Sequence, residues 1–220
     1  MSPEPSRPTL LQSAQRVTLV AVCVAALAAC ATTREPMTTT TDAEWDERRQ
    51  TLQALEEWEL RGRISLSTPS DALSGTLTWR QMFGDMDFRF RGPLGIGGMR
   101  ISGDEQQLRV KTSNGDEFYL TDPVADLESR FGWHVPLYSM QHWVLGVPST
   151  DGEEAAEQLD GSGRLASLQQ HGWTVAYESY REAGEHQLPR KLVMENGEIR
   201  IRLVVDRWSF FDDSMALSGL

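Results

Sequence analysis

Apolar and polar residues alternate with a period of two along most of the chain after residue 57. Such runs predict strands with one buried face, because successive side chains of a strand point to opposite faces of its sheet. Asn114-Gly115 and Asn196-Gly197 separate alternating runs and predict tight hairpin turns. The chain should therefore form about ten strands, mostly in hairpin order and antiparallel. The predicted strands are 58–67, 73–80, 86–91, 99–102, 107–112, 117–120, 164–170, 173–181, 188–195 and 198–206.

Three segments repeat their apolar residues at helical spacing instead. One is 42–58, and two shorter ones begin at Asp122-Pro123 and at Pro136, between the two blocks of strands. Segment 151–160 is acidic and is expected to be a solvated loop. So few helices cannot cover so many one-faced strands. The sheet should either close tightly around a filled core or curl around an apolar cavity plugged by the helices.

The first 30 residues resemble the leader of a bacterial lipoprotein. An apolar run, 17–29, follows Arg7 and Arg16, is too short to span a bilayer, and ends at Cys30 in a lipobox-like Leu-Ala-Ala-Cys sequence. The resemblance implies cleavage before Cys30 and acylation of that cysteine. Because Ala31 is not the aspartate that retains lipoproteins in the inner membrane, the implied location is the outer membrane of a Gram-negative bacterium, facing the periplasm. The expected organisation is a signal peptide (1–29), an acylated tether (30–41), a folded domain (42–208) and a tail (209–220).

Composition argues against several classes of function. The net charge of −11 disfavours a nucleic-acid partner, which needs a positive field. No cysteine follows Cys30, the four histidines are scattered, and no nucleophile elbow or phosphate loop occurs. We therefore expect no enzymatic activity, no catalytic residue, no metal site and no cofactor.

Arginines two apart occur on the polar faces of three predicted strands, at 61/63, 89/91 and 200/202. They are either a solvated face that balances the acidic surplus or a contact with an acidic partner or lipid headgroups.

The segment 92–98 places two aliphatic residues, Leu94 and Ile96, in a loop where glycine and proline exclude a regular strand. Turns normally carry polar residues, since an exposed aliphatic side chain gains nothing there. Either the two side chains fold back as a cap over the sheet, or they form a protruding apolar tip that meets a membrane or a lipid.

Motifs spread over most of the chain resemble the LolB family of outer-membrane lipoprotein receptors. They are the lipobox at Cys30, Trp45, Arg61-Gly62, Trp79-Arg80-Gln81, Gly92-Pro93-Leu94-Gly95, Asp122-Pro123, Pro136-Leu137, Trp143-Val144-Leu145-Gly146-Val147-Pro148, Gly172-Trp173-Thr174-Val175, Tyr177, Tyr180, Leu188-Pro189 and Asp206-Arg207-Trp208. The chain departs from the family pattern at Gly92, where a polar residue is common, and in its extension from Phe210 to Leu220.

The resemblance implies an open, strongly curved antiparallel half-barrel with an α lid over an apolar cavity. It also implies that the protein accepts acylated lipoproteins from a periplasmic LolA-like carrier and inserts them into the inner leaflet of the outer membrane, without covalent chemistry or nucleotide. The insertion loop would be Pro93, Leu94, Gly95 and Ile96, which favours the protruding tip.

By face and size, the residues expected to line the acyl-chain cavity and lid are Trp79, Phe88, Phe90 and Trp143. A monomer is expected. The alternative function is a passive anchored module that binds an apolar ligand or a regulatory protein on its concave face. Such a module would have no use for an exposed leucine.

Overall fold

The computed structural model describes residues 39–95, 97–104, 106–131 and 134–211. All of these except Thr39 belong to one compact unit that begins at Thr40. The signal peptide, Cys30, Ile96 and the last nine residues lie outside the described residues.

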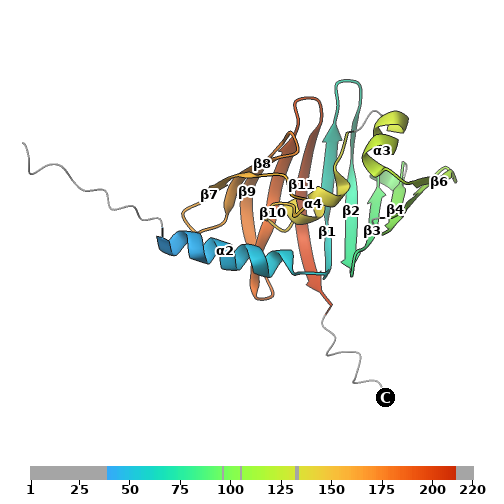
Figure 1. The fold of residues 1–220 in the computed structure, drawn as a ribbon. Coiled ribbons are helices and arrows are strands. Elements are labelled where there is room, and N and C mark those ends of the chain that lie inside the picture. Colours follow the sequence, from blue (N-terminus) through green and yellow to red (C-terminus); the bar gives the residue numbers. More distant parts are fainter. Residues whose placement is uncertain (1–38, 96, 105, 132–133, 212–220) are drawn as a thin grey trace, which may run out of the picture. The chain divides into compact units, whose positions relative to one another are not determined.

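The described residues form one antiparallel sheet of eleven strands, with the order β6-β5-β4-β3-β2-β1-β11-β10-β9-β8-β7 (Figure 1). Its two edge strands, β6 and β7, do not pair with each other, so the sheet is open, as predicted. The strands are β1 (Glu57–Ser67), β2 (Ala72–Met82), β3 (Asp85–Arg91), β4 (Met99–Gly103), β5 (Leu108–Thr112), β6 (Glu117–Leu120), β7 (Ala156–Leu159), β8 (Leu165–Gln170), β9 (Trp173–Ala183), β10 (His186–Glu195) and β11 (Arg200–Phe210).

The pairing of β1 with β11 joins the two blocks of strands into one sheet. This pairing is irregular between Arg61 and Gly62, where a side chain at position 62 would place its Cβ 2.2 Å from the carbonyl oxygen of Val204. Only glycine therefore fits at position 62 without moving β11.

Three α-helices lie among the described residues: α2 (Thr39–Gln53), α3 (Pro123–Phe131) and α4 (Leu137–Trp143). A single 3₁₀ turn, η1 (Pro93–Gly95), joins β3 to β4. The predicted helix 42–58 ends at Gln53, five residues early. Its last residue, Trp58, which the alternation also placed at the start of the predicted strand 58–67, is a strand residue of β1, paired with Gln81 on one side and Phe210 on the other. Strand pairing on both sides outweighs the helical spacing there.

The solvated loop expected at 151–160 is wrong in its second half, since residues 156–159 form the edge strand β7. A contact remote in sequence fixes this strand. The Nε1 of Trp45 on α2 donates a hydrogen bond of 2.7 Å to the carboxylate of Glu157. β7 pairs with β8 along its length, and α2 adds this side-chain hydrogen bond from outside the sheet.

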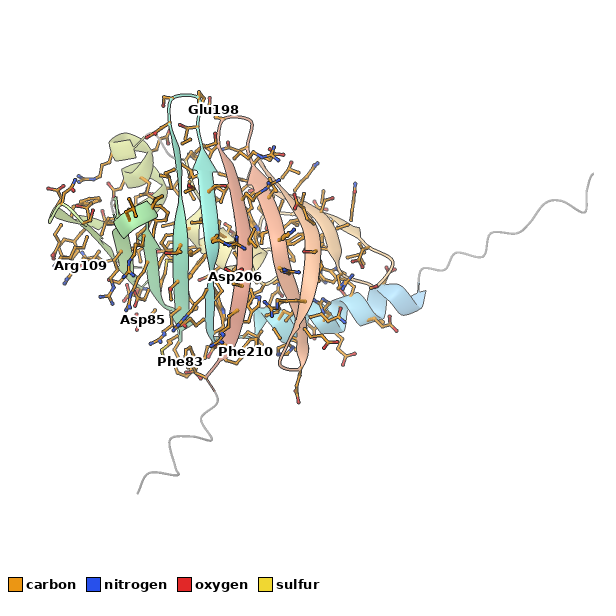
Figure 2. All side chains as sticks on the ribbon, turned by 180° about the vertical axis from the view of Figure 1, so that it is seen from behind. Phe83, Asp85, Arg109, Glu198, Asp206 and Phe210 are labelled. Carbon is orange, nitrogen blue, oxygen red and sulfur yellow. The ribbon has the colours of Figure 1, made fainter. Side chains whose placement is uncertain are left out.

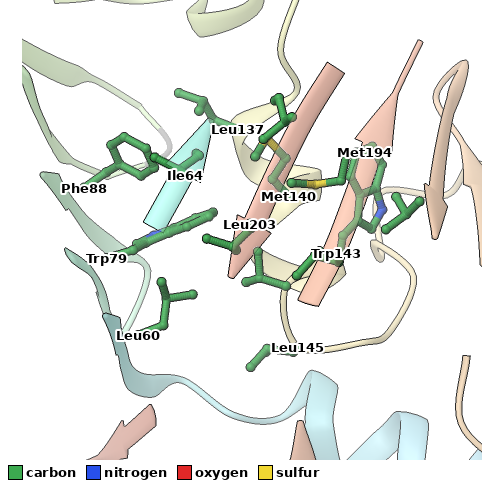
Figure 3. Close-up of a cluster of buried hydrophobic side chains, with 14 of the residues drawn as sticks. Leu60, Ile64, Trp79, Phe88, Leu137, Met140, Trp143, Leu145, Met194 and Leu203 are labelled. Carbon is green, nitrogen blue, oxygen red and sulfur yellow. The ribbon is translucent and has the colours of Figure 1, made fainter. Parts of the chain in front are cut away.

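Helix α4 fills the concave side of the sheet (Figure 3). Leu137, Met140 and Trp143 of this helix are buried against inward-facing side chains of the strands, such as Trp79 and Leu203. The sequence allowed either a filled or a hollow interior. In the structure the side chains of α4 occupy it.

Candidate functional site

The β3–β4 connection presents one leucine to solvent. Leu94 is 98 % exposed, more than the other two exposed large hydrophobic residues of the described chain, Phe83 at 66 % and Tyr119 at 51 %. A hydrogen bond from the Gly95 amide to the Gly92 carbonyl, 3.1 Å long, closes the turn beneath it. Pro93 and Gly95 are exposed as well. Of the two forms that the sequence allowed, Leu94 takes the protruding one.

Leu94 carries two unfavourable features at once. Its φ of 56° lies in the left-handed region, which costs an L-residue roughly 1–2 kcal/mol. Its side chain also forgoes the roughly 1.5–3 kcal/mol that burial would contribute. Phe83, in the turn between β2 and β3, also combines a positive φ, of 48°, with 66 % exposure, so Leu94 is distinguished by its almost complete exposure rather than by its backbone conformation.

The four predicted lining residues lie in two places rather than one. Trp79 on β2 and Phe88 on β3 are buried together, with ring centroids 5.5 Å apart in an edge-to-face arrangement. Phe90 is half-buried farther along β3. Trp143 is fully buried on α4 and packs against Trp173, at 6.3 Å between ring centroids. The sheet and the plug therefore contribute separate aromatic groups to the interior.

The carboxyl end of α4 is held by polar groups that the sequence analysis missed. The Nε1 of Trp143 donates to the side-chain oxygen of Gln170 at 3.0 Å, and the Tyr177 hydroxyl donates to the Trp143 carbonyl at 3.0 Å. Gln170 is 3 % exposed and also bonds the backbone of Ser149. A buried tryptophan N–H usually has an acceptor, but nothing in the sequence says which residue supplies it for Trp143. The Nε1 atoms of Trp79 and Trp173 are buried without a hydrogen-bond partner in the described part of the chain.

A cluster of polar and acidic side chains holds the amino-terminal half of α4. The Ser139 hydroxyl donates to Asp151 at 3.2 Å, and Asp151 and Glu153 flank the His171 ring at 2.6 and 2.5 Å. Burial raises the pKa of the Asp151 carboxyl, but hydrogen bonds and the His171 ring lower this pKa by more. The net shift is therefore downward. His171, which looked isolated in the sequence, therefore belongs to the group of side chains that holds α4 in place.

A second ionic group lies on the outer face of the sheet. The buried carboxylate of Glu59 on β1 accepts hydrogen bonds from Arg61, at 2.6 Å, and from Arg80 of β2, at 2.9 Å. Burial raises the pKa of this carboxyl, whereas the two arginines lower it by more.

Neither a membrane-spanning helix nor a metal site is found in the described part of the chain. No helix there is long and apolar enough to cross a bilayer. Within the same residues, no group of histidine, cysteine, aspartate and glutamate is arranged to hold a metal ion.

Comparison with known proteins decides the family. Residues 56–208 match the family model described as "Outer membrane lipoprotein LolB". The chain belongs to the LolB family. It is 35 % identical over 196 residues to the outer-membrane lipoprotein LolB of Pseudomonas savastanoi pv. phaseolicola, covering 88 % of this chain and 95 % of that one. It is 36 % identical over 165 residues to LolB of Pseudomonas putida, covering 75 % of this chain and 80 % of that one.

Solved structures support the fold. A LolA superfamily protein from Nitrosomonas europaea aligns with a TM-score of 0.50 at 12 % identity, over 77 % of this chain and 93 % of that one. A DUF1329 family protein from Desulfovibrio piger aligns with a TM-score of 0.51 at 8 % identity, over 83 % of this chain and 99 % of that one.

LolB membership confirms the predicted family and the predicted location in the outer membrane. It supports the predicted role as an outer-membrane lipoprotein receptor, a lipoprotein-localisation protein rather than an enzyme. The roles of individual residues stay predictions.

Proposed function

We propose that this LolB-family protein accepts the acyl chains of lipoproteins from a LolA-like periplasmic carrier beneath α4 and delivers them into the inner leaflet of the outer membrane. The observation that carries the delivery step is Leu94, exposed to 98 % at the tip of η1. Acylated Cys30 would be the anchor, and outer-membrane lipid the acceptor.

Acceptance requires α4 to move. In this structure its side chains occupy the interior that Trp79, Phe88, Phe90 and Trp143 are proposed to line. Arriving acyl chains would replace the apolar contacts of α4 with contacts of their own, so the exchange needs no nucleotide. A preference of 1.4 kcal/mol at each transfer gives a tenfold bias toward the next site.

Leu94 is too small to anchor the protein, because its burial contributes only about 1.5–3 kcal/mol. It would instead disturb the lipid leaflet locally or hold the acyl chains at the exit. If the protein were instead a passive anchored module that binds an apolar ligand or a regulatory protein, Leu94 would have no function.

The test uses the mature chain with Cys30→Ala, mixed with a carrier preloaded with acylated lipoprotein and then with liposomes. We expect Leu94→Glu to accept lipoprotein from the carrier but to deposit it poorly in the liposomes. The matched control is Tyr119→Glu, which places the same charge at another exposed hydrophobic residue, on β6.

Three results are informative. Normal deposition by Leu94→Glu would refute the role of the loop. Failure of the folded, unsubstituted chain to take up any lipoprotein would refute the receptor function and favour the passive module. Equal loss in Leu94→Glu and Tyr119→Glu would show that any added surface charge impairs deposition, and would also contradict the proposal.

A further inference from the structure

Two grooves flank η1 on the outer face of the sheet. Figure 2 shows the side of the sheet opposite to that in Figure 1, with the side chains as sticks. The first groove, of about 640 Å³, lies between the turn and strands β1, β2 and β11, and is lined by Arg63, Arg91 and Arg202. The second, of about 430 Å³, lies toward β4 and β5 and is lined by Arg89, Arg91, Arg100 and Lys111. No acidic residue lines either groove among the residues described.

These six basic residues form a collar around the base of the exposed Leu94, in a chain whose net charge is −11. The basic collar consists of Arg63, Arg89, Arg91, Arg100, Lys111 and Arg202.

The carboxylates near the collar do not neutralise it. Arg89 and Arg100 share one carboxylate, that of Asp87, and Lys111 lies 4.0 Å from the carboxylate of Glu117, which also pairs with Arg109. Arg91 has no carboxylate within 4.0 Å in the described part of the chain. The collar therefore keeps an excess of positive charge at the turn.

The remaining arginines can exchange their partners. Arg63 pairs with Asp206 at 3.2 Å and Arg202 with Glu178 at 3.4 Å, and all four side chains are exposed. Exposed pairs of this kind contribute little to stability, so an arriving anion can replace the carboxylate at small cost.

The register of the paired strands brings these arginines together. Arg63 is paired with Thr76, Thr76 with Arg91, and Ser65 with Arg202, so their side chains share the outer face. The floor of the first groove is made of small residues, Ser65, Ser74, Gly75 and Thr76, which leave room between the arginines. Gly75 is required for the close approach of β3, since a Cβ there would lie 2.2 Å from the Arg91 carbonyl oxygen.

We propose that the first groove binds the phosphate of an anionic phospholipid headgroup while Leu94 lies among the acyl chains of the same leaflet. This inference rests on the proposed function of the loop. Guanidinium groups bind phosphate oxygens with paired hydrogen bonds, and three of them face one groove. A membrane is the occupant that offers a phosphate surface and, directly beneath it, the apolar medium that the leucine lacks in water.

The experiment is sedimentation of the mature Cys30→Ala chain with vesicles of phosphatidylcholine alone or with added phosphatidylglycerol. We compare Arg63→Gln/Arg91→Gln/Arg202→Gln with a control, Arg190→Gln, which neutralises an exposed arginine of β10. An arginine near an anionic surface changes binding about five-fold, so the loss of three should weaken binding to phosphatidylglycerol vesicles on the order of a hundredfold. Arg190→Gln should bind as the parent does, and salt should weaken parental binding.

Several outcomes overturn the proposal. These are unchanged vesicle binding by the triple variant, an equal loss in Arg190→Gln, and displacement of the protein from vesicles by millimolar inorganic phosphate at constant ionic strength, which would indicate a site for the free ion. A triple variant that binds vesicles normally but no longer receives lipoprotein from the carrier would assign the collar to the carrier instead.

The two proposals fail separately. If the parent chain delivers no lipoprotein but its vesicle binding still depends on the three arginines, the proposed function is wrong and the headgroup site stands. If Leu94→Glu blocks deposition while the triple variant binds vesicles normally, the loop function stands and the headgroup site is wrong.

Discussion

Replacing Gln170 by leucine should loosen α4 without touching its apolar contacts. The Gln170 side chain makes four hydrogen bonds: its oxygen accepts from Trp143 Nε1 and the Ser149 amide, and its nitrogen donates to the carbonyls of Ser149 and Glu153. A leucine has similar size and no polar atom. Two donors, the Trp143 N–H and the Ser149 N–H, would lose this acceptor inside the protein.

The magnitude follows from those two donors. A buried donor left without a partner costs about 1–3 kcal/mol, so the pair costs roughly 2–6 kcal/mol. Extra apolar burial by the leucine offsets roughly 1–2 kcal/mol of this loss. We expect a net destabilisation of about 3 kcal/mol, equivalent to a fall in Tm of roughly 6–12 °C for a domain of this size.

Urea unfolding measures the free energy, and hydrogen exchange at residues 137–149 measures opening of α4. The control is Gln169→Leu, at the neighbouring exposed position of β8, which should change stability by less than about 0.5 kcal/mol. Trp143→Phe removes one donor, so a double-mutant cycle with Gln170→Leu should give a coupling energy of about 1–2 kcal/mol. A coupling energy near zero, or unchanged hydrogen exchange at residues 137–149, would refute the assignment of Gln170 as a residue that holds α4 in place.

Three further predictions concern the frame around the site. Gly62→Ala should cost about 2–3 kcal/mol in urea unfolding, because its Cβ would meet a β11 carbonyl oxygen at 2.2 Å; parental stability would contradict this. Trp45→Phe should lose about 1.5–3 kcal/mol with its bond to Glu157, and should speed hydrogen exchange at 156–159; unchanged exchange there would disprove that α2 holds β7. The Glu59 carboxyl, whose pKa is lower in the folded state, stabilises the protein above about pH 4.5, and this contribution should vanish as the pH falls below its folded pKa. Acid titration of stability should therefore be shallower in Glu59→Gln, and identical profiles would refute the prediction.

The strands were predictable because burial on one face imposes the period of two directly on the sequence. All ten predicted strands are present, and the edge strand β7 was missed. Its four residues, Ala156–Leu159, carry no strong alternation. They pair with β8, and Glu157 also accepts a hydrogen bond from Trp45 of α2. The local sequence pattern gives no information on a hydrogen-bond partner such as Trp45, which lies 112 residues away from Glu157.

The candidate site divides in the same way. The exposed Leu94 was noticeable because an aliphatic residue between glycine and proline contradicts local turn chemistry. Nothing in the sequence marks Gln170 and His171 as unusual. Each looks like an ordinary polar residue, and only the fold brings α4 next to it. The arginine pairs were visible, but strand register was needed to place Arg63 and Arg202 on one groove with Arg91.

In the proposed mechanism, acceptance and delivery take place on opposite faces of the sheet. The interior proposed to receive acyl chains is covered by α4 on the concave face, whereas the groove beside Leu94 is lined by outer-face residues such as Arg63 and Arg202. Leu94 makes no buried contact, so it cannot contribute to acyl chains held inside. A substitution at Leu94 should therefore leave both the stability and the uptake step unchanged. Reduced uptake by a stable Leu94→Glu variant would mean that the chains travel over the outer face, and that the sheet does not divide the two steps.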